Sequence, residues 1–220
     1  MDIWTAIRKR RSTRVFDQTR TVAREDIVRL IDAARWAPSA CDRQDWKFIV
    51  IENELIRERI IRHGTASFLR DAPVWILVCY GNRTDNREYK DDCLTAAMAA
   101  QNIQLMAYSL GLGTCCVANL PPKIVLRRIL GIPRRYSPVL VVAIGYPADT
   151  HKPPPRKSGV DGLISYDRFI DGNNNETPGG NGRVWARRWA RWIYFRLPLP
   201  VKRLLRPLAV RYERKFDENE

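Results

Sequence analysis

A run of cations and hydroxyls, Arg10-Arg11-Ser12-Thr13-Arg14, is the first part of this sequence that could do chemistry. Guanidinium groups bind phosphate oxygens through paired hydrogen bonds, and a serine hydroxyl and backbone N–H groups can fill the remaining oxygens. The run therefore predicts a phosphate-binding site. The alternative is that these cations only offset the dipole at the end of a helix.

Two further segments carry small and polar residues between predicted elements. The first spans residues 37–46 and reads A-P-S-A-C-D-R-Q-D-W. It is either a loop that approaches a planar heterocycle and hydrogen-bonds its edge, or an ordinary helix-to-strand connection. The second spans residues 111–119 and reads G-L-G-T-C-C-V-A-N. It lacks the third glycine of a dinucleotide fingerprint and follows a helix, so by itself it predicts a helix cap.

The cysteines and histidines exclude several other chemistries. The chain has five cysteines without a C-x-x-C pair and two histidines, which argues against a disulfide framework and a zinc site. The adjacent Cys115 and Cys116 lie in an apolar run without a nearby His or Lys, which favours inert thiols. His63 and His151 suggest no hydrolytic triad. We therefore expect no metal site and a reduced, cytoplasmic protein.

Hydrophobic periodicity predicts the elements that position these segments. Helices are expected at 2–9, 24–36, 91–110 and 122–130, and strands at 46–51, 74–80, 114–118 and 139–146. The helix at 122–130 is expected to begin with a proline in its first turn. The helix at 91–110 is apolar nearly all round, which predicts a buried central helix. Helices that alternate with a few short strands favour an α+β or α/β layered fold.

Taken together and in this order, the motifs resemble those of the FMN-dependent nitroreductase family over about residues 2–170. They are R-R-S-x-R at 10–14, A-P-S with Q-x-W at 37–46, G-L-G-T-C at 111–115, L-G-I-P at 130–133 and G-Y-P with P-R-K at 145–157. The resemblance implies an α+β, three-layer α-β-α fold with a central mixed, mainly antiparallel sheet. It also implies a homodimer with an FMN at each subunit-interface site.

The resemblance assigns residues of this chain to three parts of the FMN. Those at the phosphate and the ribityl or pyrimidine part are Arg10, Arg11, Ser12, Arg14, Arg156 and Lys157. Those on a loop of the other subunit, against the isoalloxazine, are Pro38, Ser39, Ala40 and Asp42. Those at a strand end beside flavin N5 are Cys116, Val117 and Ala118.

The implied activity is transfer of reducing equivalents from NAD(P)H, through flavin N5, to a small organic acceptor such as a nitroaromatic or a quinone. No side chain is expected to act as a nucleophile, because the cofactor carries the chemistry. The cationic run agrees with this from the residues alone, since a reduced flavin is anionic near N1. The alternative is a non-catalytic nitroreductase-like scaffold that a C-terminal tail recruits to a membrane surface or a protein partner.

Three positions depart from the family pattern. Asp42 stands where Asn is usual, Asp45 where Pro is usual, and Cys116 where Trp is usual. Two carboxylates beside a flavin would oppose its reduced anion unless Arg43 or another arginine pairs with them. Loss of the Trp is expected to reshape the face on which an acceptor stacks.

The net charge of +14 is concentrated near the C-terminus, where residues 183–220 alone contribute +7. We expect a core domain at 1–170, a Gly/Asn-rich linker at 171–182 and a basic aromatic amphipathic tail at 183–220. Apolar faces flanked by arginines suit either an anionic membrane surface, contacted through residues 183–216, or docking on the protein's own dimer. Nucleic acid is not expected, because no nucleic-acid-binding fold is recognisable.

The sequence also predicts how the chain meets a membrane. Its longest apolar runs are far shorter than the roughly 20 residues that a spanning helix needs. Its first residues do not resemble a signal peptide. We therefore expect a cytoplasmic protein, with the tail peripheral at the inner face of the membrane.

Overall fold

The computed structural model describes residues 2–82, 90–148 and 156–169 of the 220-residue chain. The chain divides into two compact units, residues 1–155 and 156–220, and each is described by itself. The described part of the second unit is exposed and contains one short 3-10 helix, η4 (Asp161–Leu163). The predicted linker at 171–182 and tail at 183–220 lie outside the described residues.

The first unit is built on a four-stranded antiparallel sheet with the strand order β1-β2-β4-β3. Its strands are β1 (Trp46–Ile51), β2 (Val74–Gly81), β3 (Gly113–Val117) and β4 (Tyr136–Gly145). A parallel bridge between Ser12 and Thr114 adds the N-terminal segment to the β3 edge. The sheet is therefore mainly antiparallel with one parallel contact, which confirms the architecture that the resemblance implies.

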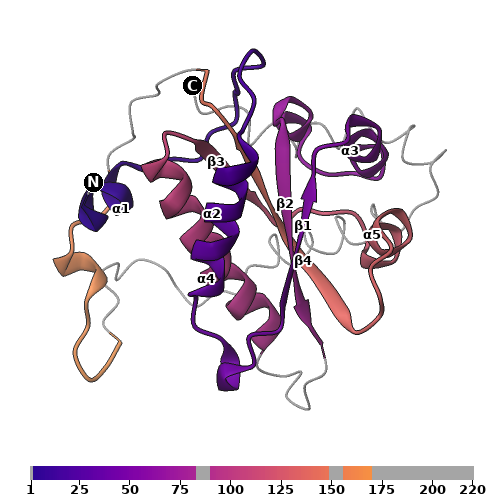
Figure 1. Ribbon diagram of the computed structural model, residues 1–220. Coiled ribbons are helices and arrows are strands. Elements are labelled where there is room, and N and C mark those ends of the chain that lie inside the picture. Colours follow the sequence, from indigo (N-terminus) through magenta and orange to yellow (C-terminus); the bar gives the residue numbers. More distant parts are fainter. Residues whose placement is uncertain (1, 83–89, 149–155, 170–220) are drawn as a thin grey trace, which may run out of the picture. The chain divides into compact units, whose positions relative to one another are not determined.

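Helices cover both faces of this sheet and make three layers (Figure 1). One face carries α2 (Arg24–Arg35) and α4 (Asp91–Ser109), and the other carries α3 (Glu54–Ile61) and α5 (Lys123–Leu130). The described part of this unit also contains a short N-terminal helix, α1 (Ile3–Lys9), and two 3-10 helices, η1 (Ala40–Asp42) and η2 (Ser67–Asp71).

The central strand β2 supplies both cores, because successive side chains of a strand point to opposite faces. Ile76 and Val78 pack into the core beneath α2 and α4, whereas Trp75 and Leu77 pack into the core beneath α3 and α5. All eight positions of β2 are buried. The Trp75 indole N–H donates to the Leu69 carbonyl at 3.0 Å, so its buried polar group has a partner.

The structure corrects several expectations about the elements. Only one face of α4 is buried, and Leu94 and Met98 on the other are 55% and 42% exposed. The prediction of a buried central helix is therefore correct for one face of α4 and wrong for the other. Two elements, α3 and η2, were not predicted. Strand β4 begins at Tyr136, three residues before the predicted start. Pro122 was predicted inside the helix at 122–130, but it is the residue before α5.

In residues 2–82, 90–148 and 156–169, no helix is long and apolar enough to cross a bilayer.

Candidate functional site

The basic run of residues 10–14 lies directly against the start of β3. Helix α1 ends at Lys9, and the chain then continues extended, so that the Thr13 N–H donates to the Thr114 carbonyl at 2.9 Å. Ser12 and Thr114 form the parallel bridge. Two motifs that lie about a hundred residues apart in sequence are thus joined by backbone hydrogen bonds.

Glycines allow this close approach. A Cβ on Gly113 would lie 2.5 Å from the Thr13 hydroxyl oxygen, so any side chain there would push the basic run away from β3. Gly111 has a φ of +74°, which glycine adopts without steric cost, and it turns the chain from the end of α4 into β3. The G-L-G-T motif therefore does more than cap a helix, because it seats the basic run.

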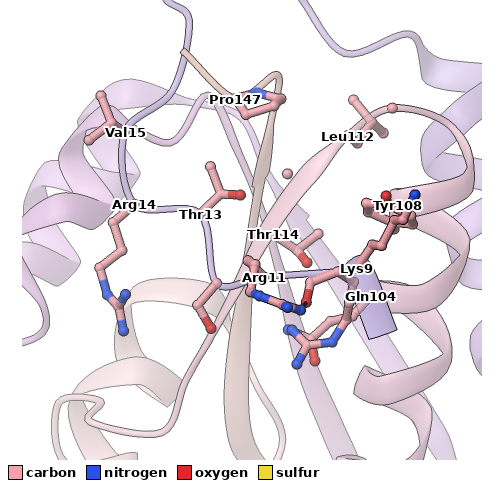
Figure 2. Close-up of a pocket in the computed structure, with 14 residues that line it drawn as sticks. Lys9, Arg11, Thr13, Arg14, Val15, Gln104, Tyr108, Leu112, Thr114 and Pro147 are labelled. Carbon is pink, nitrogen blue, oxygen red and sulfur yellow. Dashed lines mark hydrogen bonds between the residues drawn. The ribbon is translucent and has the colours of Figure 1, made fainter. Parts of the chain in front are cut away.

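These segments line a pocket with a volume of about 230 Å³ (Figure 2). Its lining residues come from the basic run, from α4 and from the turn into β3: Lys9, Arg10, Arg11, Ser12, Thr13, Arg14, Val15, Gln104, Tyr108, Gly111, Leu112, Gly113, Thr114 and Pro147. A site for a whole small-molecule ligand typically has a volume of about 300–1,000 Å³. The pocket therefore fits one end of a cofactor, such as a phosphate with the adjoining chain.

The charge in the pocket is positive and unopposed. Lys9, Arg10, Arg11 and Arg14 line it, and no carboxylate lies among its lining residues. In the part of the chain that the structure describes, the ion pairs all involve other residues. Such a pocket attracts an anion.

The arginines of the run are held in different ways. The Arg11 guanidinium donates to the carbonyls of Arg8 and Arg10, both at 2.6 Å, and so caps the end of α1. The Arg14 guanidinium lies 5.9 Å from the centre of the Phe68 ring. Arg11 therefore interacts with the end of a helix, as the alternative interpretation of the basic run expects. Among the described residues, the Arg10 side chain makes no such contact.

The adjacent thiols of Cys115 and Cys116 in β3 are poorly ionised. Burial raises the pKa of the Cys115 thiol, although Arg14, the Ser12 hydroxyl and Arg10 act in the opposite direction. Burial and the neighbouring Cys115 raise the pKa of Cys116 from 9.0 to about 11, even though its side chain reaches the surface. Both shifts agree with the expectation of inert thiols.

Alkylation tests this directly. A pKa of about 11 instead of 9.0 lowers the thiolate population of Cys116 at pH 8 about 100-fold. Because a thiolate of higher pKa is also more nucleophilic, we expect iodoacetamide to modify Cys116 about 10-fold more slowly than an unfolded thiol. Peptide mass spectrometry in buffer and in urea gives the two rates. Equal rates for Cys116 in the folded and the unfolded chain would contradict the expectation.

The loop at 37–46 does not reach this pocket within one chain. Three of its residues have a left-handed backbone, Cys41, Asp42 and Gln44, with φ values of 51°, 49° and 49°. Left-handed backbone in residues other than glycine is strained and concentrates at functional sites. The strained loop is therefore a candidate second part of the site.

Hydrogen bonds and an ion pair hold this loop in place. The Gln44 backbone N–H donates to the Ser39 hydroxyl at 3.0 Å, and the Gln44 side-chain amide donates to Asp42 at 2.9 Å. Arg43 lies 3.7 Å from the Asp45 carboxylate. The arginine partner that Asp45 requires beside a flavin is therefore present in the loop itself.

The structure thus gathers part of the predicted set. Arg10, Arg11, Ser12 and Arg14 line one pocket together. The loop residues Pro38, Ser39, Ala40 and Asp42 do not line it, and neither do Cys116, Val117 and Ala118 at the end of β3. Arg156 and Lys157 are exposed and belong to the second unit.

Four pocket residues were not predicted from the sequence: Lys9, Val15, Gln104 and Tyr108. For Gln104 and Tyr108, the sequence spacing gave a weak indication. Gln104 and Tyr108 lie four residues apart in the predicted helix at 91–110, and residues with that spacing share one helix face.

The sequence profile described as the nitroreductase family matches residues 7–64 and 58–146, which is most of the first unit. The chain belongs to the nitroreductase family. A relative from Methanothermobacter thermautotrophicus, named "Putative NADH dehydrogenase/NAD(P)H nitroreductase", is 38% identical over 155 residues, which are 68% of this chain and 79% of the relative. Family membership places the chain among oxidoreductases.

Solved structures of the family share the fold. A protein from Parabacteroides distasonis, named "Putative NADH dehydrogenase/NAD(P)H nitroreductase", has a TM-score of 0.66 and 28% identity over 76% of this chain and 98% of that one. A protein from Clostridium difficile R20291, named an FMN-dependent nitroreductase, has a TM-score of 0.65 and 26% identity over 76% of this chain and 99% of that one. In this nitroreductase-family chain, the two motifs that the Ser12–Thr114 bridge joins lie within the matched residues.

Proposed function

We propose that the protein is an FMN-dependent oxidoreductase that takes reducing equivalents from NAD(P)H and passes them to a small organic acceptor. The observation that carries the proposal is the pocket that Arg10, Arg11, Ser12 and Arg14 line without a carboxylate. A phosphate monoester carries a charge of about −1.5 to −2 at neutral pH and three acceptor oxygens. The chemistry of the pocket therefore fits the phosphate end of FMN.

Each candidate residue has a role in this proposal. Arg10, Arg11 and Ser12 hold the phosphate, with Arg14 toward the ribityl or pyrimidine part and Arg156 and Lys157 as later basic contacts. Pro38, Ser39, Ala40 and Asp42 of a second subunit face the isoalloxazine, and Cys116, Val117 and Ala118 lie by N5. FMN, when bound, supplies the centre that accepts a hydride from NAD(P)H and reduces the acceptor.

Two features of the loop at 37–46 make it compatible with a flavin. The Arg43–Asp45 pair at 3.7 Å places a cation next to the carboxylate that stands in place of the usual proline. The Asp42 carboxylate accepts a hydrogen bond from the Gln44 side-chain amide at 2.9 Å. Both contacts reduce the repulsion that these carboxylates would exert on a reduced flavin.

We further propose a homodimer, because large apolar side chains stand exposed on the helices of one layer. Val28 of α2 is 61% exposed, and Trp36, which follows the last residue of α2, is 74% exposed. Leu94 and Met98 of α4 are 55% and 42% exposed. Trp4 of α1 is 62% exposed. A second copy would cover this surface and would bring its own loop at 37–46 to the site.

The decisive experiment is an absorption spectrum of the purified protein after incubation with FMN and gel filtration. We expect the visible bands of an oxidised flavin, their bleaching by NADH or NADPH, and a mass by light scattering of twice 25.5 kDa. A colourless protein that takes up no FMN would contradict the oxidoreductase proposal and favour a non-catalytic scaffold. The proposed contact of residues 183–216 with an anionic membrane surface rests on the sequence pattern alone.

A further inference from the structure

Gln104 is a buried polar side chain in the wall of the cationic pocket. It lies on α4, is 7% exposed and lines the pocket (Figure 2). Among the described residues, its side-chain amide has no hydrogen-bond partner. Because Gln104 lines the pocket, a ligand that enters the pocket can supply a hydrogen-bond partner for this amide.

Packing does not explain a glutamine at this position. Its buried neighbours on the helix, Ala100, Ile103 and Ala107, are apolar and belong to the core beneath α2 and α4. An apolar residue at 104 would continue this face. The one feature that distinguishes position 104 from its neighbours is that it opens onto the pocket.

The charge around Gln104 determines which part of the amide a ligand would use. Lys9, Arg10 and Arg11 line the same pocket, and all three are hydrogen-bond donors without acceptor capacity. An anionic oxygen is favourable among these cations, and it accepts hydrogen bonds only. The glutamine therefore contributes its side-chain N–H group. Gln104 lies on α4, whereas the cations lie on the N-terminal segment across the pocket.

We propose that Gln104 is a further cofactor-binding residue that donates its side-chain N–H to the phosphate of FMN. This inference rests on the proposed function, since it takes FMN to be the ligand of the pocket. It adds a neutral donor from α4 to the charged donors of residues 10–12. The phosphate is then held from two elements that are far apart in sequence.

The test compares FMN with riboflavin, which has the same ring and ribityl chain but lacks the phosphate. Apoprotein is titrated into each flavin, and the quenching of flavin fluorescence gives both dissociation constants. For Gln104→Leu, we expect the FMN constant to rise about 10-fold, the lower end for a hydrogen bond to a charged group, and the riboflavin constant to stay unchanged. Gln104→Glu places a carboxylate at the phosphate and is expected to weaken FMN binding further.

Gln101 provides the matched control. It lies on the same helix, is exposed and does not line the pocket. Gln101→Leu and Gln101→Glu are expected to change both constants less than twofold. Far-ultraviolet circular dichroism with thermal melting establishes that all four variants are folded.

The outcomes separate the inference from the function on which it rests. A wild-type protein that binds FMN no better than riboflavin overturns the phosphate site and the inference with it. If the wild type binds FMN more tightly than riboflavin and the Gln104→Leu variant does so by the same factor, the inference is overturned and the proposed function stands. A Gln104→Leu variant that loses FMN and riboflavin to the same extent also overturns it, because Gln104 then acts on the fold and not on the phosphate.

Discussion

Replacing Leu77 by alanine is expected to lower the free energy of unfolding by about 2–5 kcal/mol. Leu77 lies on the central strand β2, is 0% exposed and belongs to the core beneath α3 and α5. Its strand neighbours are Ile49 of β1 and Val141 of β4, so hydrogen-bonded backbone holds it on both sides. Removal of the side chain leaves a cavity that this rigid surrounding cannot close.

Urea denaturation followed by circular dichroism measures the loss, and Leu55→Ala is the matched control. Leu55 is the same residue type on α3 but is 76% exposed, so we expect its replacement to change the unfolding free energy by less than about 0.5 kcal/mol. An unchanged slope of free energy against urea would show that the Leu77 variant unfolds to the same state. Equal losses for the two leucines would contradict the assignment of Leu77 to the core.

The strands were predictable because their signal is local. Apolar runs at 46–51 and 74–80 lie between turn-forming or charged residues, and the structure places β1 and β2 there. Helix α3 was missed because its eight residues mix charges with isoleucines and lie between two strands. Its Asn53 cap, which accepts a hydrogen bond from the Ile56 N–H, was the available signal.

The exposed face of α4 shows a limit of hydrophobic periodicity. A helix that is apolar nearly all round predicts burial, but the sequence does not say whether its own chain or another one covers each face. The alanines at 96, 99, 100 and 107 are buried in the core that α4 shares with α2 and the sheet, where small side chains permit close packing. Leu94 and Met98 remain exposed in this chain, and in the proposed homodimer the second copy covers them.

The candidate site was predictable in its chemistry but only in part in its geometry. The residue types at 10–14 indicate phosphate binding by themselves, because arginine and serine donors suit phosphate oxygens. Their contact with residues 111–114 depends on a backbone bridge between Ser12 and Thr114, which no local pattern specifies. The four-residue spacing of Gln104 and Tyr108 places both on one helix face, but it does not say which segment lies against that face.

Replacing Arg10 by alanine is expected to weaken FMN binding about 10- to 150-fold, the loss of a hydrogen bond between charged groups. Arg10 is half-buried and lines the pocket, and its backbone N–H caps α1 through the Ala6 carbonyl at 3.0 Å. The backbone contact survives the substitution, so the loss reports on the guanidinium. Fluorescence titration with FMN and with riboflavin measures it, and the riboflavin constant is expected to stay the same.

The control and the pH dependence decide whether the loss reflects phosphate recognition. Arg59→Ala removes an exposed cation from α3, on the opposite face of the sheet, and is expected to leave both constants unchanged. Because the second pKa of a phosphate monoester is about 6, FMN gains a negative charge between pH 5 and 7. Wild-type affinity for FMN should therefore rise over this range, and it should rise less in the Arg10→Ala variant, which has one cation fewer to sense the second charge. If the two proteins show the same pH dependence, the phosphate lies elsewhere, and the cations at 10–14 serve only the end of α1.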